Sequence, residues 1–135
     1  MAQLFTTKGF LNIGGAVLLA LGILGFILWY ATGQAENDVF YLDNGENVAH
    51  VVLGVVALAL ARVLPANGSL QRLVVAVVGI VALFFGIYGF TVAGEAHPNT
   101  FELANLENPL DNLLHLVVGA WGVMAAVRGG AAAKA

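Results

Sequence analysis

The chain has 135 residues, of which 60% are hydrophobic and only 10% are charged, and its mean hydropathy is +0.90. Because soluble domains carry about 25% charged residues, this composition excludes an ordinary soluble domain and indicates an integral membrane protein. The formal net charge is −3 and cysteine is absent, so the sequence offers neither a disulfide framework nor a thiolate metal site, and it contains no basic patch for nucleic acid.

The first apolar segment covers residues 9–31, and Asn12 is the one clearly polar side chain between Phe10 and Tyr30. About twenty helical residues cross the hydrocarbon core of a bilayer. Lys8 precedes this segment as in a signal peptide, but the apolar run exceeds a usual h-region and no A-x-A cleavage site follows closely. We therefore predict a transmembrane helix that is retained.

Three further apolar segments cover residues 47–64, 73–93 and 111–127. The first and the last of these are short for a span, so their length alone would also fit buried helices. The charges decide the question. All five cations lie beside the N-terminus, the short middle loop or the C-terminus, whereas all eight acids lie in or at the ends of the two longer loops. This separation indicates four crossings, and the positive-inside rule places both termini in the cytoplasm and the acidic loops of residues 32–46 and 94–110 on the outer face of the cell membrane.

The chain is an internal duplication. The stretch "GAVLLALGILGF" of residues 15–26 aligns with "GIVALFFGIYGF" of residues 79–90, and the second and fourth segments align in the same way. We predict an all-α fold, a four-transmembrane-helix bundle made of two helical hairpins, residues 9–64 and 73–128, within a single integral membrane domain of residues 1–135. Both hairpins start on the same side, so they are expected to be parallel repeats related by a pseudo-two-fold axis along the membrane normal.

Both the second and the fourth segment contain the motif N-x-x-H-x-x-x-G. Its members are Asn47, His50 and Gly54 in the first copy and Asn112, His115 and Gly119 in the second. On a helix these positions form one stripe that runs from polar to small, which is typical of the packing face of a membrane helix. Trp121, in the fourth segment, has no aromatic counterpart in the second and is expected to face lipid or a partner subunit.

An acid precedes each motif asparagine, Glu46 in the first copy and Asp111 in the second. The stretches "DNGE" and "NPLD" both resemble helix N-termini, in which an N-cap residue is followed three residues later by an acid, and Pro109 would take the first helical position of the second. We expect the two acids to serve capping, with tuning of the histidine four residues later as the alternative.

The paired histidines His50 and His115 allow several interpretations. Each imidazole could form a hydrogen bond across the helix interface and lock the hairpins together. Alternatively, the two could ligate haem b iron or the magnesium of a chlorophyll-type pigment, with Gly54 and Gly119 leaving room for a flat macrocycle. A transition metal held by the histidines and nearby acids is less favoured because only two histidines repeat, and a sensor of external pH is also compatible. His97 has no counterpart and is expected to be a solvated loop residue.

With these motifs the chain resembles a family of small bacterial and archaeal integral membrane proteins with four spans, catalogued as a domain of unknown function. The resemblance extends from about residue 9 to residue 127. It rests on "LGILGF", on both N-x-x-H-x-x-x-G motifs, on "ALAR" at residues 59–62 and on "GIYG". It implies the four-span fold and no activity, because the family has none assigned.

The function we predict from the sequence is association within the membrane. No ionisable group lies near the bilayer centre, which argues against a pump or channel, and the few polar groups at membrane depth form no acid–base or nucleophilic constellation. We expect a non-catalytic protein, not an enzyme, embedded in membrane lipid and bound to copies of itself as a homo-oligomer or to other membrane protein subunits as an accessory subunit. The alternative is a carrier of haem b, or of a chlorophyll or carotenoid pigment, for electron transfer or light harvesting through His50 and His115.

Overall fold

The computed structural model describes residues 2–32, 42–96, 98–101 and 105–132, and within these ranges the fold is all-helical, with four long helices and no β-strand. A short 3-10 helix, η1, precedes them at Ala2–Phe5. The long helices are α1 (Thr7–Thr32), α2 (Asn44–Val63), α3 (Ser69–Thr91) and α4 (Leu110–Ala132). The predicted all-α, four-helix fold class is therefore confirmed.

All four helices are long and apolar enough to cross a membrane. The spans defined by length and composition have 25, 20, 23 and 20 residues in chain order. The second and fourth are longer than the sequence predicts, because the polar first turn of α2 and the small residues at the end of α4 are also helical. A helix of 20 residues rises about 30 Å, which matches the hydrocarbon core of a bilayer.

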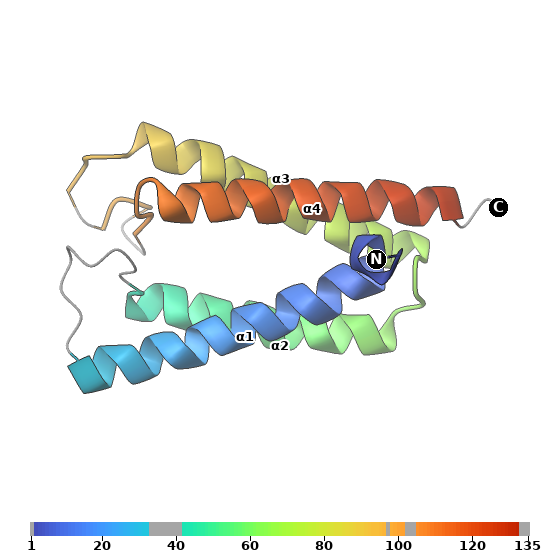
Figure 1. The fold of residues 1–135 in the computed structure, drawn as a ribbon, viewed down its shortest axis with the longest axis horizontal. Coiled ribbons are helices and arrows are strands. Elements are labelled where there is room, and N and C mark those ends of the chain that lie inside the picture. The colour runs from blue at the N-terminus through green and yellow to red at the C-terminus, as the bar shows by residue number, and fades with distance from the viewer. Residues whose placement is uncertain (1, 33–41, 97, 102–104, 133–135) are drawn as a thin grey trace.

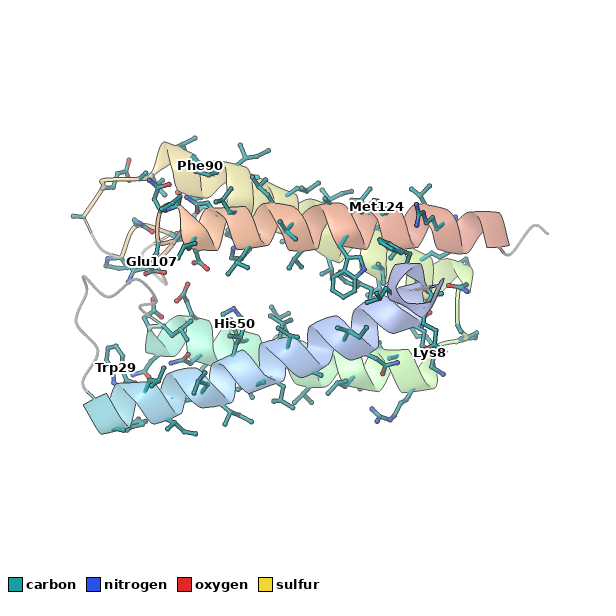
Figure 2. The ribbon with its side chains drawn as sticks, viewed as in Figure 1. Lys8, Trp29, His50, Phe90, Glu107 and Met124 are labelled. Carbon is teal, nitrogen blue, oxygen red and sulfur yellow. The ribbon has the colours of Figure 1, made fainter. Side chains whose placement is uncertain are left out.

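The helices form two antiparallel hairpins, in which α1 packs along α2 and α3 packs along α4 (Figure 1). Contacts between the hairpins are fewer and come mainly from α1 with α3 and α4 and from η1 with α4. We call the end where α2 and α4 begin the acidic end, and the end where α1 and α3 begin the basic end. Figure 2 shows Lys8 at the basic end and Glu107 at the acidic end.

The apolar core lies near the basic end, where all four helices contribute buried side chains. Its fully or almost fully buried members are Phe10, Leu11, Ala61, Val75, Ala125 and Ala126. A buried polar contact lies beside this core. The Thr7 hydroxyl donates a hydrogen bond to Gln71 Oε1 at 2.6 Å, and the Asn67 backbone N–H donates to the same oxygen at 3.0 Å. The start of α1 is thereby joined to the start of α3.

Trp121 makes contacts within the chain but stays half-buried, so the expectation that it faces lipid or a partner subunit stays a prediction. Its indole N–H donates a hydrogen bond of 2.7 Å to the Leu4 carbonyl of η1. Its ring meets the Phe10 ring edge-on, with centroids 4.8 Å apart. Here η1 folds back across the basic end and supplies a carbonyl acceptor that an indole N–H would lack in lipid. Trp121 thus fastens η1 and α1 to α4.

Candidate functional site

The motif asparagines, Asn47 and Asn112, are fully buried and hold the chain that enters their helices. Asn47 Nδ2 donates to the Leu42 carbonyl at 3.0 Å, and Asn112 Nδ2 donates to Asn108 Oδ1 at 3.3 Å. The side-chain oxygen of each asparagine faces a glycine of the other helix in its hairpin. These asparagines therefore serve local structure at the acidic end.

The motif glycines lie against the backbone of the neighbouring helix, as a packing stripe predicts. A Cβ on Gly54 would lie 2.7 Å from the Leu19 nitrogen of α1, and a Cβ on Gly119 would lie 2.6 Å from the Leu83 nitrogen of α3. Backbone atoms thus fill the space beside both glycines. A flat macrocycle has no room at these two positions in this fold.

The N-terminus of α2 is capped as the sequence predicts. Asp43 is the N-cap residue, and its Oδ1 accepts a hydrogen bond from the Glu46 backbone N–H at 2.9 Å. The Glu46 carboxyl group also forms a hydrogen bond with the Asp43 backbone. This reciprocal pair is a capping box, which satisfies two backbone donors that the helix leaves free.

The start of α4 differs from the prediction. The helix begins at Leu110, so Pro109 precedes it instead of taking its first helical position, and Asn108 accepts a hydrogen bond from Asn112 Nδ2. The Asn108 side-chain oxygen, which the sequence offers as the cap, is taken up by the Asn112 side chain instead of a backbone N–H of the first turn. The Asp111 carboxyl group makes its hydrogen bonds with Glu107, through both the backbone and the side chain of that residue.

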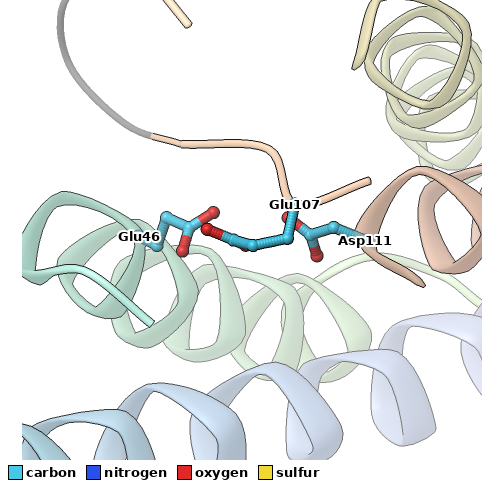
Figure 3. Close-up of side chains that lie close together, drawn as sticks. All are labelled: Glu46, Glu107 and Asp111. Carbon is cyan, nitrogen blue, oxygen red and sulfur yellow. The ribbon is translucent and has the colours of Figure 1, made fainter. Parts of the chain in front are cut away.

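Three acidic side chains from the two hairpins meet at the acidic end. Glu46 comes from the first turn of α2, Glu107 precedes α4, and Asp111 lies in the first turn of α4. Carboxylate oxygens of all three lie within 4.8 Å of one another (Figure 3). We call Glu46, Glu107 and Asp111 the carboxylate cluster.

The carboxylate cluster is largely withdrawn from solvent. Glu46 is only 8% exposed, and the other two acids are half-buried. Each member has one buried oxygen without a hydrogen-bond partner, namely Glu46 Oε2, Glu107 Oε1 and Asp111 Oδ2. The pairing of Glu107 with Asp111 and the capping contact of Glu46 thus leave one acceptor on every carboxyl group unused.

The surroundings of the cluster are mainly acidic, and the imidazoles of His50 and His115 are the nearby groups that can carry a positive charge. Burial and the nearby carboxylates of Asp111 and Asp43 together raise the pKa of Glu107 to about 7, against a backbone hydrogen bond that lowers it. Asp43 also joins the hairpins, because its Oδ2 accepts a hydrogen bond from the Asn105 backbone N–H at 3.0 Å. The lysine and arginine residues within the described ranges all lie in the half of the molecule that contains the basic end, which we call the basic half. They are Lys8, Arg62, Arg72 and Arg128.

The two histidines stand one turn further along their helices and differ in their contacts. His115 Nδ1 is 2.9 Å from the Asp111 backbone carbonyl, so its hydrogen bond lies within its own helix and does not cross an interface. His50 Nδ1 is buried without a partner. His50 interacts electrostatically with Asp111 and His115 of the other hairpin, and Figure 2 shows it on the side of α2 that faces that hairpin.

Sequence reasoning named Glu46, Asp111 and the two histidines as candidate site residues and Asp43 as an N-cap candidate, but it missed Glu107. Glu107 was expected only to be a loop acid, and the available signal was its place in "ENPLD", just before the start of the fourth helix. His97 lies outside the described residues. The cluster is thus formed by one predicted capping acid from each hairpin and one loop acid.

No protein-family model matches the chain, and no curated protein or solved structure matches it either. The resemblance to four-span proteins of unknown function stays a prediction. The geometry of the site and the surface of the helices therefore carry the evidence for function.

Proposed function

We propose that the chain is a non-catalytic integral membrane protein that acts by association, either with copies of itself or as an accessory subunit of a larger membrane complex. In this proposal the acidic end faces outward and the basic end, with both termini, faces the cytoplasm of a cell membrane. The distribution of charge supports that orientation, because cations favour the cytoplasmic side.

The observation that carries the proposal is how little of each span the chain itself covers. Only 17% to 28% of the residues in the most apolar window of each helix are buried inside the chain. On α2, Val48 and Val52 each keep 53% of their surface exposed, and on α4 Val117 keeps 66%. Such faces contact either lipid or other helices, and membrane helices associate through side-chain packing.

The two hairpins support the further proposal that they are parallel repeats about an axis along the membrane normal. Gly25 packs against Asn47 in the first hairpin as Gly89 packs against Asn112 in the second. Gly15 likewise approaches the Gly54 carbonyl as Gly79 approaches the Gly119 carbonyl, at 3.0 Å from the Cβ position in both cases. Matching contacts at matching positions are what duplicated hairpins would retain.

Crosslinking in native membranes tests association directly, because the chain has no cysteine of its own. Val52→Cys and Val117→Cys place a thiol on the exposed faces of α2 and α4. Val75→Cys is the matched control, since Val75 is fully buried. We expect crosslinked species with one of the exposed variants and none with the control. A protein that stays a 14.0 kDa monomer in lipid nanodiscs, with no crosslink from either exposed face, would contradict the proposal.

The alternative, a carrier of haem or pigment, has a different signature. A visible absorption spectrum of gently purified protein should show no Soret or chlorophyll band if the motif histidines are structural. A band that is lost in His50→Ala and His115→Ala would overturn the association proposal in favour of the cofactor carrier. If the histidines are structural, these two substitutions should instead lower the thermal stability of the protein.

A further inference from the structure

We propose that the carboxylate cluster of Glu46, Glu107 and Asp111 binds one divalent metal cation between the two hairpins. The site would take a cation that prefers oxygen ligands, such as Mn²⁺ or Ca²⁺. This inference is independent of association, because a monomer in detergent would hold all three ligands.

The spacing of the three carboxylates suits a single shared ion. Oxygens that ligate such a cation lie about 2.0 to 2.6 Å from it, so two ligands on opposite sides are about 4 to 5 Å apart. The cluster oxygens lie within 4.8 Å of one another. One ion can therefore contact all three carboxyl groups with small side-chain adjustments and no displacement of the helices.

Glu46 provides a separate observation that points to a ligand. A carboxylate buried to this degree is costly unless it is neutralised, and Glu46 is only 8% exposed. Its capping role uses a backbone contact, yet Oε2 stays buried without any partner. Figure 3 shows this carboxyl group directed at Glu107 of the other hairpin. Capping alone does not explain that direction.

The surroundings offer no lysine or arginine to do the same work, and the imidazoles of His50 and His115, which can carry a positive charge near Asp111, leave Glu46 Oε2 without a partner. Within the described part of the chain, the lysine and arginine residues belong to the basic half, whereas Asp43 adds a fourth acid near the cluster. A divalent cation would offset two of these charges at once. Because Glu46 belongs to one hairpin and the other two ligands to the second, the ion would also join the hairpins at the end that is remote from the apolar core.

The test uses the full chain in detergent, freed of metal with a chelator and dialysed. Calorimetric titration with Mn²⁺ should give one ion per chain, and Mn²⁺ electron paramagnetic resonance should show the free-ion signal decreasing in step.

Glu46→Gln and Asp111→Asn should each weaken binding by about tenfold or more. Glu95→Gln is the matched control, because Glu95 is exposed at the same end and the substitution removes the same charge; it should bind as the unsubstituted protein does. Ca²⁺ added in competition distinguishes a general oxygen site from one selective for Mn²⁺.

Folding of the variants is checked by melting in chelator, where Glu46→Gln should be at least as stable as the unsubstituted chain because a like-charge contact is relieved. Added Mn²⁺ should then raise the melting temperature of the unsubstituted chain and not that of the variant. The proposal is overturned if neither Mn²⁺ nor Ca²⁺ binds up to about 1 mM, the weakest range of extracellular calcium sites. It is also overturned if Glu46→Gln and the unsubstituted chain bind equally well, since the cluster would then hold protons only.

Discussion

Gly25 of α1 lies directly against the side-chain amide of Asn47 on α2, and the position that a Cβ of residue 25 would take is already occupied by the Asn47 oxygen. Gly89 and Asn112 have the same relationship in the second hairpin. Neither asparagine oxygen has a hydrogen-bond partner. In each glycine, the hydrogen that stands where other residues have a Cβ points at the asparagine oxygen. A Cα–H group of this kind is a weak hydrogen-bond donor.

This relationship predicts that Gly25→Ala and Gly89→Ala are destabilising. The added methyl group overlaps the asparagine amide, so the hairpin must open or the amide must leave its site, and overpacking of this kind costs about 1 to 3 kcal/mol. The free energy of unfolding in mixed detergent micelles, followed by circular dichroism, measures the loss.

Gly14→Ala is the control for these substitutions, because the nearest neighbouring atom to its Cβ position is 4.0 Å away, on Trp121. Alanine is the better helix former by up to about 1 kcal/mol, so this variant should be as stable as the unsubstituted chain or more so. In addition, Asn47→Ala should remove most of the penalty of Gly25→Ala when the two are combined. Equal stability of Gly25→Ala and Gly14→Ala would show that the contact is unimportant.

The four helices could be predicted because the bilayer leaves an apolar chain few choices. A backbone surrounded by lipid must satisfy its hydrogen bonds internally, so each run of about twenty apolar residues becomes a helix. The cap at Asp43 could also be predicted, since it depends on four consecutive residues. The start of α4 could not, because it depends on how Asn108 divides its hydrogen bonds between backbone and side-chain donors.

The candidate site was predictable only in part, for a related reason. Periodicity places Asn47, Gly54 and their counterparts on a packing face, but it does not say which residues of α1 lie opposite. That depends on how the helices cross, so Gly25 and Gly89 could not be assigned as partners. Glu107 was missed because its approach to Glu46 depends on how two hairpins dock, which no local pattern records.

A second prediction concerns the buried link between Thr7 and Gln71 at the basic end. Thr7→Val keeps the shape of the side chain but removes the donor of the 2.6 Å hydrogen bond to Gln71 Oε1. The loss of a buried hydrogen bond should cost about 1 to 3 kcal/mol of unfolding free energy. Thr91→Val is the control, because the Thr91 hydroxyl is exposed and donates only to the Tyr88 carbonyl of its own helix. If both variants unfold at the same detergent composition, the link does not stabilise the fold.

A third prediction follows from the contact between Trp121 and η1. Trp121→Phe keeps an aromatic ring beside Phe10 but removes the N–H that donates to the Leu4 carbonyl. The short η1 helix should then open more often, so the Thr6 backbone amide, which donates to the Gln3 carbonyl, should exchange with deuterium faster, while the amides of α2 should be unchanged. Tyr30→Phe, at the opposite end and 79% exposed, should leave the exchange of the Thr6 amide as it was. Unaltered exchange in Trp121→Phe would mean that other contacts hold η1, such as that of Arg128 over the Phe5 ring.

The last prediction is a pH dependence of stability that arises from Glu107. Burial beside Asp111 and Asp43 raises the pKa of Glu107 from 4.5 to about 7 in the folded protein. The folded state therefore binds a proton more tightly than the unfolded chain does. The consequence is that stability falls as the pH rises from about 4.5 and levels off above about 7.

Melting temperatures between pH 4.5 and 8, recorded in chelator so that no metal contributes, should accordingly be highest at the lowest pH of this range. Glu107→Gln cannot ionise, so its melting temperature should vary less with pH than that of the unsubstituted chain, and the difference between the two curves should grow across the interval from pH 4.5 to 7. Glu46 and Asp111 remain in both proteins, so the residual slope of the variant reports on them, and the difference reports on Glu107 together with its coupling to these two acids. Glu95→Gln should follow the unsubstituted curve, because Glu95 is exposed. Parallel curves for Glu107→Gln and the unsubstituted chain would mean that Glu107 ionises with the same pKa in the folded and unfolded states, and hence that its carboxyl group does not share a buried site with Asp111.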